Sequence, residues 1–491
     1  MLLIAEGFRA TYEIESLGRM LFPELSPAQP AGDRSGDYVL VRMEQRPETI
    51  DLSVTISFCG REETRAKTVS DLSEKEAVLP LALLLYDAAR VLTGRELRWG
   101  VLTGIRPVKL FHHALHEGQS DAQIAARMRT SFAMRDDMIA LALEIARAEA
   151  KINAKSRRNG FSLYVSIPFC PQRCSYCSFV SQTVERAGPL IPQYVELLWD
   201  GRRRTGAVAR VFGLTIKRVY VGGGTPTTLT AEQLAALFDT IADSFDLSEV
   251  LEYTVEAGRP DTIDARRLSA LKSAGVNRIS VNPQTMNDEV LAGVGRNHTA
   301  TDVERAFALA RSMGFSSINM DLIAGLPGDT PDRFFNSLDR VLALRPENIT
   351  VHTLTLKRAS TLRGEADAMA HYARCDEVAQ MVDGARTRIR AAGLSPYYLY
   401  RQKNSIGSLD NTGYSLPGHE GVYNVFIMDE IQTILAAGAG AVTKLCAPGN
   451  QIRRIFNFKF PYEYISRYEQ VIARKEQVRG FYEEHPTKPE F

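Results

Sequence analysis

From Phe161 onward the sequence alternates short apolar runs with longer amphipathic segments. Short runs rich in Val, Ile and Tyr are typical of buried strands, and the segments between them have the apolar spacing of helices. The expected strands cover 161–167, 216–221, 251–257, 277–282, 316–322 and 348–355, and the expected helices cover 191–210, 231–243, 264–274, 301–313, 331–344 and 371–392. Alternating strands and helices form a parallel sheet with helices outside it. Six repeats are too few for an eight-stranded barrel, so the pattern predicts an α/β fold with a partial (β/α)6 TIM-type barrel.

The length of 491 residues is sufficient for two or three domains. We expect an N-terminal α+β domain, the partial barrel and a mainly helical C-terminal region, at residues 1–157, 158–395 and 396–491. In the first of these, Tyr38–Met43 and Ile50–Phe58 alternate apolar and polar residues as half-buried strands do. Ser73–Leu92 has helical apolar spacing, and the polar, turn-forming run KSRRNG at 155–160 marks the boundary with the barrel.

Composition and charge argue against several classes of partner. The net charge is +1, from 59 basic and 58 acidic residues, so no global field attracts nucleic acid or an anionic membrane. No apolar run approaches the ~20 residues of a spanning helix, and the opening MLLIAEGFRATYEI is too short and acidic for a signal peptide. Six cysteines are too few for a disulfide scaffold in a chain of this length. We therefore expect a cytoplasmic monomer that binds neither nucleic acid nor a membrane.

Three cysteines follow the first expected strand in a CxxxCxxC spacing, at Cys170, Cys174 and Cys177. Pro168 and Pro171 interrupt regular structure there, which places the thiols on a loop at the end of a strand. Three neighbouring thiolates suit an iron–sulfur cluster, and they would leave one iron of a 4Fe–4S cubane open to a small molecule. Two alternatives remain: three unrelated buried cysteines, or half of a zinc site. Zinc usually takes four ligands, and no second Cys/His pair at ligand spacing follows.

Unusual residues stand at the carboxyl ends of the next expected strands. The second strand ends in GGGTP at 222–226, where missing side chains let the backbone approach a ligand. The third ends in Glu256 and the fourth in Gln284, while Asp321 interrupts the apolar fifth strand and needs a partner, which Arg296 could be. Each alone is also compatible with a tight turn, a helix cap or a surface acid. Ligands of parallel α/β folds bind at this edge, so together these residues predict one site facing the cysteine loop.

Taken in order, the motifs resemble a known group of enzymes. YVSIPFCPQRCSYC, GGGTP, the Val-Glu strand, the Gln284 strand and DLIAGLPG resemble the radical S-adenosylmethionine (SAM) enzymes, and more narrowly the oxygen-independent coproporphyrinogen III oxidase family. The resemblance covers roughly residues 160–445. The N-terminal block and the run YYLYRQKN, at 397–404, are similar to the longer, HemZ-type coproporphyrinogen dehydrogenases of that family.

The resemblance implies two cofactors and a set of residues that bind them. The three cysteines would hold a 4Fe–4S cluster, and the amino and carboxylate groups of SAM would chelate its open iron. SAM would further be contacted by residues on the cysteine loop and at the strand ends, namely Tyr164, Tyr176, Gly223, Gly224, Thr225, Glu256, Gln284, Arg296 and Asp321. The cofactor performs the difficult step in such enzymes, so we expect no side-chain base or nucleophile and assign no catalytic residue.

The activity implied is that of an oxidoreductase of porphyrin and heme biosynthesis. Two propionate groups of coproporphyrinogen III would undergo oxidative decarboxylation to vinyl groups, which gives protoporphyrinogen IX. A flavodoxin- or ferredoxin-type protein would supply the electron that cleaves SAM. The four carboxylates of the tetrapyrrole would need cations, for which Arg401 and Lys403 beside Tyr397, Tyr398 and Tyr400 are candidates. A solvated loop is an equal alternative for this stretch.

Two other functions remain open. The heme-chaperone branch of the same family carries a His-Asn-x-x-Tyr-Trp motif, and HEGVYN at 419–424 keeps only its His and Tyr. The best-known oxidases have a fourth cysteine in CxxxCxxCxC, whereas Ser178 and Phe179 follow Cys177 here, and the chaperones also lack that cysteine. A radical SAM enzyme with another substrate is the third possibility, because likeness of fold does not settle chemistry.

Overall fold

The computed structural model describes residues 1–28, 36–157, 159–357, 360–362, 374–402, 405, 407, 409–447 and 451–485. The chain divides into two compact units. The N-terminal unit comprises Met1–Ala146, Glu365–Asp376 and Leu399–Asp410, and the barrel unit comprises Arg147–Gly364, Glu377–Tyr398 and Asn411–Phe491. Later segments of the chain thus belong to the first unit, and the division into three consecutive domains stays a prediction.

The N-terminal unit is built on a five-stranded sheet with the order β2-β1-β3-β4-β5. The strands are β1 (Leu2–Glu6), β2 (Ser26–Ala28), β3 (Tyr38–Gln45), β4 (Thr49–Phe58) and β5 (Arg61–Ser70), and the helices include α1 (Tyr12–Leu21), α2 (Glu74–Thr93), α3 (Val108–His116) and α4 (Asp121–Phe132). Alternate residues of β4 are buried and pack with the apolar face of α2 in one core. Helix α2 begins at Ser73, whose side chain accepts a hydrogen bond from the backbone of Glu76 in a capping box.

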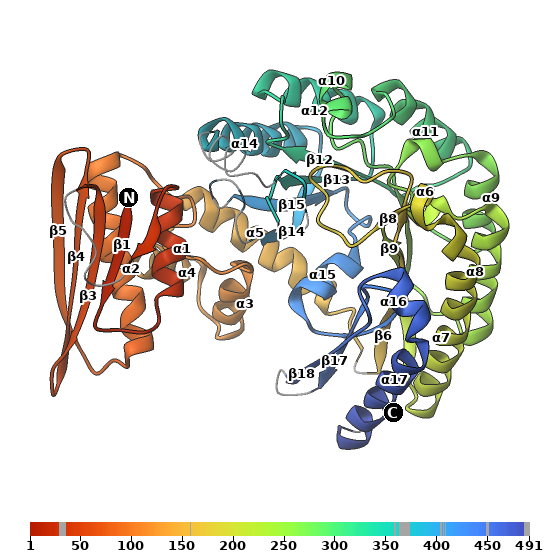
Figure 1. Ribbon diagram of the computed structural model, residues 1–491, viewed down its shortest axis with the longest axis horizontal. Coiled ribbons are helices and arrows are strands. Elements are labelled where there is room, and N and C mark those ends of the chain that lie inside the picture. The colour runs from red at the N-terminus through yellow and green to blue at the C-terminus, as the bar shows by residue number, and fades with distance from the viewer. Residues whose placement is uncertain are drawn as a thin grey trace. The chain divides into compact units, whose positions relative to one another are not determined.

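Six parallel strands form the centre of the barrel unit, and they are neighbours in chain order. They are β6 (Gly160–Ile167), β9 (Thr215–Gly223), β10 (Glu252–Glu256), β11 (Arg278–Ser280), β12 (Ile318–Ala324) and β13 (Asn348–Thr353). Helices run along the outside of this sheet in an arc (Figure 1), namely α7 (Ile191–Val211), α8 (Ala231–Ser244), α9 (Ala265–Ser273), α11 (Ala300–Ser312), α12 (Pro331–Leu344) and α14 (Cys375–Ala391). The predicted α/β fold with a partial barrel of six βα repeats is confirmed.

The C-terminal region extends this sheet at both edges. Strand β16 (Thr433–Ala437) pairs in parallel with β6, and β17 (Val442–Ala447) and β18 (Gln451–Phe456) follow as antiparallel strands. At the other edge, β15 (Asp410–Ser415) pairs with β13 and is followed by β14 (Ser395–Arg401). The region also holds α15 (Val422–Asp429), α16 (Pro461–Ser466) and α17 (Tyr468–Glu484). It contains helices, as expected, and also strands that the sequence pattern did not indicate.

Helix α15 is fixed to the amino end of β10. The carboxylate of Glu252 accepts hydrogen bonds from the backbone N–H groups of Val422 (2.6 Å) and Tyr423 (3.1 Å), a favourable place for an anion because the first N–H groups of a helix are otherwise unpaired. The ring of Tyr423 then stacks on Tyr220 of β9, with 4.4 Å between ring centroids. The helix is therefore held against β9 and β10 within the barrel unit.

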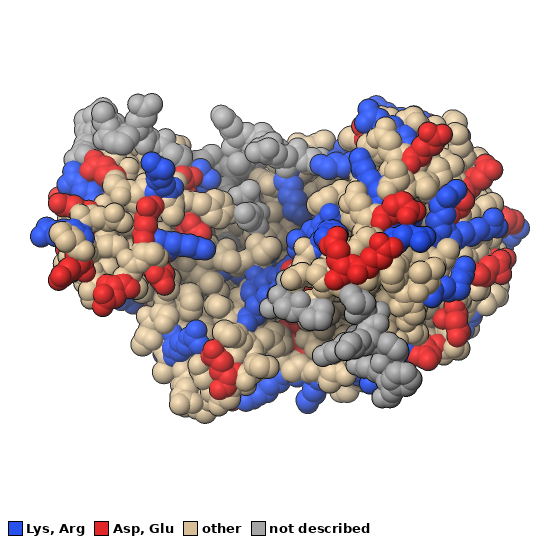
Figure 2. Space-filling view, turned by 90° about the horizontal axis from the view of Figure 1, so that it is seen from below, with Lys and Arg blue, Asp and Glu red and all other residues tan. Residues whose placement is uncertain are grey.

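Surface charge is mixed in sign. On the face seen in Figure 2, basic and acidic side chains are interspersed, as the net charge of +1 suggests. None of the helices described is both long and apolar enough to cross a membrane.

Candidate functional site

The three cysteines of the CxxxCxxC motif lie on one loop beyond the end of β6. The base of the loop is closed where β7 (Phe169–Cys170) pairs with β8 (Gln182–Thr183). Cys174 is buried, Cys170 and Cys177 are half-buried, and all three are free thiols. Burial raises the pKa of Cys170, and it raises the pKa of Cys177 to about 11. The neighbouring thiols raise both pKa values further, so the three sulfurs lie close together in a place that disfavours uncompensated thiolates.

The far side of the loop is tied to later parts of the barrel. The backbone N–H of Ser175 donates to the carbonyl of Val294 (3.0 Å). The carbonyl of Ser175 accepts hydrogen bonds from the Ser360 hydroxyl (2.8 Å) and from the Thr361 N–H (3.0 Å). The sulfurs are therefore carried by a loop whose backbone is held at both ends, which is the preorganisation that a metal site requires.

The glycine run at the end of β9 packs directly against the cysteine loop. Gly224 donates its N–H to the Ile167 carbonyl (2.8 Å), and Thr225 donates its N–H to the Phe169 carbonyl (2.7 Å). A Cβ atom on Gly224 would lie 2.5 Å from the Phe169 carbonyl oxygen, so a side chain cannot fit. Gly223 has φ of 109°, in the region that only glycine adopts readily. The Thr225 hydroxyl donates to the Cys170 sulfur at 3.5 Å.

Glu256 lies at the carboxyl end of β10 among aromatic residues. Its Oε1 accepts a hydrogen bond of 2.6 Å from the Tyr220 hydroxyl. The ring of Tyr220 stacks against Tyr164 on one neighbouring strand, with 6.1 Å between centroids, and against Tyr423 of α15. Burial raises the pKa of Glu256 to about 7, and the charge of Asp321 adds to the rise. A buried acid beside a phenol hydroxyl is suited to receiving a cationic ligand, which would restore its charge.

Replacing Glu256 with Gln is expected to flatten the pH dependence of stability in protein free of ligands. The pKa of Glu256 is about 7 in the folded state, compared with 4.5 ordinarily, so the folded protein holds a proton that the unfolded chain releases in this interval. Stability then falls as pH rises from about 4.5 to about 7, by about 1.4 kcal/mol per pH unit. Thermal unfolding at about pH 5 and about pH 8 measures the effect.

The control for this experiment is Glu289→Gln, because Glu289 is an exposed residue of α10 (Asp288–Gly293) that pairs with Arg333. Its variant should keep the pH dependence of the parent. If the Glu256 variant loses as much stability between the two pH values as the parent, the carboxyl is not protonated in the fold and its assignment as a buried acid is wrong.

Gln284 and Asp321 lie together at the middle of β12. Gln284 has φ of 67°, an uncommon left-handed conformation for a residue with a side chain, and such strain is often found at functional sites. Its backbone bonds to the Asp321 carbonyl and to the Ile323 N–H, both at 2.9 Å. Its side-chain Oε1 is buried and has no hydrogen-bond partner among the described residues. This amide can therefore accept a hydrogen bond from a ligand.

Asp321 finds partners that the sequence did not identify. Asn319 donates to its Oδ1 at 2.7 Å, and His352 Nε2 of β13 lies 3.7 Å from its Oδ2. Burial by itself would raise the pKa of Asp321, but these neighbours outweigh burial and hold the pKa below its usual value. The side chain is therefore an ionised carboxylate, and it is carried by the middle of β12.

Arg296 is not the partner of Asp321, and that expectation is corrected. The guanidinium of Arg296 donates to the Tyr176 hydroxyl (3.0 Å) and to the carbonyls of Gly258 (3.0 Å) and Asn282 (2.7 Å). Arg296 follows α10 in the chain, and the two carbonyls that it binds lie just beyond the ends of β10 and β11. Arg296 thus fastens the cysteine loop, through Tyr176, to two strand ends.

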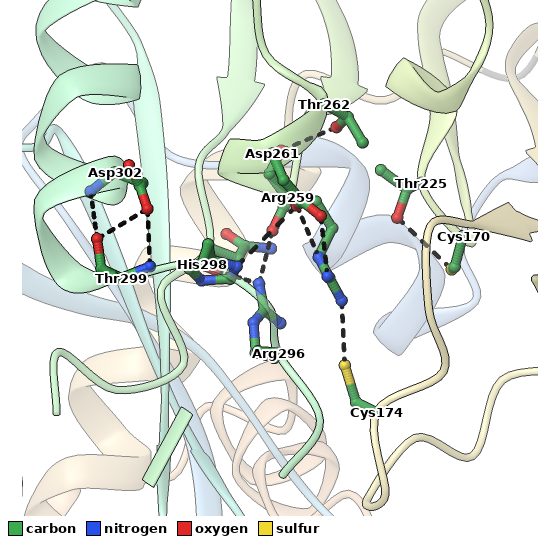
Figure 3. A network of polar contacts seen from close by, with 12 residues as sticks. Cys170, Cys174, Thr225, Arg259, Asp261, Thr262, Arg296, His298, Thr299 and Asp302 are labelled. Carbon is green, nitrogen blue, oxygen red and sulfur yellow. Dashed lines mark hydrogen bonds and ion pairs between the residues drawn. The ribbon is translucent and has the colours of Figure 1, made fainter. Parts of the chain in front are cut away.

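Arg259 is a site residue that the sequence analysis missed. It follows Gly258 just beyond the end of β10 and is 4% exposed. Its Nη1 donates to the Cys174 sulfur at 3.5 Å, while Nε and Nη2 donate to the carboxylate of Asp261 at 3.0 and 3.1 Å (Figure 3). The sequence feature that could have indicated it is a basic residue three positions after Glu256, just beyond the same strand end.

The expected substrate clamp is not found at Arg401. This residue belongs to the N-terminal unit and is 3% exposed. Its Nη1 donates to the Leu102 carbonyl at 2.5 Å, its guanidinium lies 5.8 Å from the centre of the Trp99 ring, and burial lowers its pKa to about 10. A buried guanidinium held in this way is a packing element of the unit and is not a surface cation. Lys403 lies outside the described residues.

His419, the possible axial ligand, has a structural role through its backbone. Its carbonyl accepts hydrogen bonds from Arg278 Nη1 (3.0 Å) and from Asn348 Nδ2 (2.6 Å). Both donors come from the first residues of central strands, β11 and β13. His419 therefore stands at the amino edge of the sheet, opposite the edge that carries the cysteine loop.

A partial barrel with a three-cysteine loop and polar strand ends at its carboxyl edge has the architecture of the radical SAM class. Residues 164–341 match the model of the Radical SAM superfamily. The solved structure of coproporphyrinogen III oxidase HemN from Escherichia coli, a radical SAM enzyme, has a TM-score of 0.50 and 22% identity, and the alignment covers 67% of this chain and 73% of that one.

Comparison with known relatives identifies the family within this superfamily. The oxygen-independent coproporphyrinogen-III oxidase-like protein HemZ of Bacillus subtilis is 36% identical over 94% of this chain and 94% of its own length. The heme chaperone HemW of the same organism is 34% identical over 48% of this chain and 62% of its own. This chain therefore belongs to the radical SAM superfamily and, within it, to the family of oxygen-independent coproporphyrinogen-III oxidase-like proteins. Its cofactors are a 4Fe–4S cluster and SAM.

Proposed function

We propose that this protein is an oxygen-independent coproporphyrinogen III dehydrogenase, which converts two propionates of coproporphyrinogen III to vinyl groups in heme biosynthesis. The observation that carries the proposal is the extent of the likeness to HemZ. It spans 94% of both chains and so includes the N-terminal unit. The likeness to the HemW chaperone of the same organism covers 48% of this chain.

The residues of the cysteine loop fit the cluster. The Cys174 thiol is close enough to raise the pKa values of Cys170 and Cys177, and bound iron would stabilise the thiolate forms of all three. Cys170 and Cys174 also receive hydrogen bonds from Thr225 and Arg259, as cluster ligands commonly do. The three thiolates would therefore hold the cluster, and SAM would bind at the iron without a protein ligand.

The strand ends fit SAM, which carries an ammonium, a carboxylate, a ribose and an adenine. Backbone groups of Gly223 and Gly224 would line its methionyl part, and Glu256 is available to its ammonium. Asp321 is an ionised carboxylate that can accept from ribose hydroxyls, and Gln284 presents a buried acceptor that has no partner within the described part of the chain. Tyr164, Tyr176, Thr225 and Arg296 support this site by packing and hydrogen bonds.

When bound, these cofactors supply the one-electron chemistry by which a hydrogen atom is taken from a substrate carbon. The residues of the chain orient the cofactors and exclude water, and none is required as a base or nucleophile. The stacked rings of Tyr164, Tyr220 and Tyr423 form an apolar wall next to Glu256. The proposal includes a flavodoxin- or ferredoxin-type electron donor and a monomer that acts in the cytoplasm.

Two other functions are weighed against this one. A heme chaperone is favoured by the HemW relatives, but the chain keeps only part of their heme motif, and the His419 backbone is used to hold two strands. A radical SAM enzyme with a different substrate would use the same cofactor site. Both alternatives predict different results in the following experiment.

Anaerobic turnover with coproporphyrinogen III tests the proposal. Reconstituted protein with SAM and a chemical or flavodoxin reductant is expected to form protoporphyrinogen IX, with about two SAM consumed per product because two propionates react. Product is measured by chromatography after oxidation to the porphyrin. In parallel, the same preparation is titrated with heme.

The two measurements separate the three functions. Tight stoichiometric binding of heme without turnover would identify a chaperone and overturn the proposal. SAM cleavage that coproporphyrinogen does not alter, without porphyrin product or tight heme binding, would indicate another substrate.

A further inference from the structure

A buried arginine that the family motifs did not indicate points at the cysteine loop. Arg259 and Cys174 are 85 residues apart in sequence, and Nη1 of the guanidinium donates to the sulfur of Cys174 at 3.5 Å. Hydrogen bonds to sulfur are longer than those to oxygen, so this distance is a normal contact. Figure 3 shows the guanidinium lying between Asp261 and the sulfur.

Asp261 fixes the orientation of that guanidinium. Its two carboxylate oxygens accept from Nε and Nη2 of Arg259 at 3.0 and 3.1 Å, the bidentate arrangement in which an arginine is most rigid. The backbone is anchored as well, because the Thr262 hydroxyl donates to the Arg259 carbonyl at 2.8 Å. Because Nε and Nη2 of the guanidinium are bound to Asp261, Nη1 is the nitrogen that faces the sulfur.

The contact between Arg259 and Cys174 is shielded from solvent. The side chain of Arg259 is 5% exposed, and Cys174 is buried. His298, whose Nδ1 lies 4.0 Å from Asp261, is also buried, and burial together with the charges of Arg296 and Arg259 lowers its pKa to about 4. The histidine is therefore neutral, and the local charges are those of Asp261, Asp302, Arg259, Arg296 and the thiolate. A hydrogen bond from a cation acts strongly at such low dielectric.

We propose that Arg259 is a positioning residue that raises the reduction potential of the cluster by donating a hydrogen bond to its ligand Cys174. The inference rests on the proposed role of the three cysteines. Reduction adds one electron, and hence one negative charge, to the cluster and its thiolates. A positively charged donor on a ligand sulfur stabilises the reduced form more than the oxidised form. The electron comes from the flavodoxin- or ferredoxin-type donor, which needs less driving force as a result.

The other cysteines provide an internal comparison. Cys170 receives a hydrogen bond from the neutral hydroxyl of Thr225. Cys177 lies near Arg173 and Lys357, whose charges act on its thiol. Charge-assisted hydrogen bonds are roughly twice as strong as neutral ones, so the contact at Cys174 should have the largest influence on the potential.

The test is a redox titration of reconstituted protein without SAM, followed by the electron paramagnetic resonance signal of the reduced cluster. Arg259→Met removes the donor and the charge while keeping most of the volume. Its equilibrium constant for one-electron reduction is expected to fall at least about tenfold, which corresponds to a potential about 59 mV more negative. Iron content should stay near that of the parent, because Arg259 is not a ligand.

A matched control is Arg311→Met. Arg311 of α11 also pairs with a carboxylate, donating from Nη2 to both oxygens of Glu347 at 2.8 and 3.1 Å. It binds next to the amino end of β12, where the Glu347 carboxylate accepts from the Ile318 N–H. This variant also loses an arginine–carboxylate ion pair of the barrel, although a more exposed one, and Arg311 has no contact with the cysteine loop among the described residues, so its cluster potential should equal that of the parent. A fall in both variants would attribute the effect to general loosening of the barrel and overturn the inference.

A second substitution carries the test if the methionine variant does not fold. Arg259→Lys retains the charge, but an ammonium lacks the planar fork that reaches Asp261 and the sulfur together. Its potential should also fall, by less than in the methionine variant. If either variant has normal iron content and the reduction potential of the parent, the proposed role of Arg259 is wrong, while the assignment of the cluster ligands stands. If the Cys174→Ala variant instead keeps the iron content of the parent, the assignment of Cys174 as a cluster ligand is wrong, and the inference about Arg259 falls with it.

Discussion

Cys174→Ala protein should lose most of its iron after anaerobic reconstitution and should cleave no SAM. The parent is expected to hold about four irons per chain, as a cubane cluster does. Cys174 is the buried member of the three thiols and also receives the hydrogen bond of Arg259. Its removal leaves two sulfur ligands and an unpaired buried guanidinium edge. Iron analysis, the visible spectrum and release of 5′-deoxyadenosine measure the outcome.

The remaining cysteines provide controls for that experiment. Cys59 is exposed, while Cys375 and Cys446 are half-buried and lie elsewhere in the sequence. The sulfur of Cys446, for example, donates to the Glu430 carbonyl near β17. Serine at each of these positions should leave iron content and SAM cleavage unchanged. The assignment of the cluster ligands is wrong if Cys174→Ala keeps the spectrum and activity of the parent.

Gly224→Ala is expected to have the second largest effect, because the added methyl group has no space. Its Cβ would lie 2.5 Å from the carbonyl oxygen and 2.9 Å from the nitrogen of Phe169, and 3.0 Å from the Cys170 sulfur. Two of these atoms are backbone and cannot rotate away, so β7 and the cysteine loop must move. Overpacking of this kind costs about 1–3 kcal/mol, and displacement of the thiol should reduce the iron bound on reconstitution severalfold. Thermal unfolding and iron analysis measure the two effects.

Gly480→Ala is the control for an added methyl group. Gly480 lies within α17, and nothing lies within 4 Å of the Cβ that it would gain. Alanine in the middle of a helix is favoured over glycine by about 0.5–1 kcal/mol, so this variant should unfold at the temperature of the parent or slightly above it, with full iron content. If Gly224→Ala binds as much iron as Gly480→Ala, the close contact between the glycine run and the cysteine loop is not needed for the site.

Local patterns were sufficient to predict the central elements of the barrel. The expected helix at 331–344 is α12, and the expected strand at 161–167 is β6 to within a residue. Buried parallel strands read as continuous apolar runs, and capping residues such as Thr230 before α8 mark helix starts. Strand β16 was missed because its parallel partner is remote, whereas β17 pairs with the neighbouring strands β16 and β18. β16 pairs with β6, hundreds of positions earlier in the chain.

The sequence by itself also determined which thiols belong together and which edge of the sheet carries polar residues. The spacing of Cys170, Cys174 and Cys177 is short enough that one loop must hold them, and strand ends in a parallel sheet share an edge by topology. These inferences depend on neighbours in sequence or on the direction of the strands. No knowledge of long-range packing was needed for them.

Only the tertiary structure decided which partner each buried charge takes. Arg296 could have paired with Asp321, but it bonds to Tyr176, 120 residues away, and to two carbonyls. His352 takes its place beside Asp321, Arg401 is buried on a backbone carbonyl, and Arg259 reaches Cys174. A buried charge must be paired wherever the chain closes around it, and the available partners are set by contacts between residues far apart in sequence.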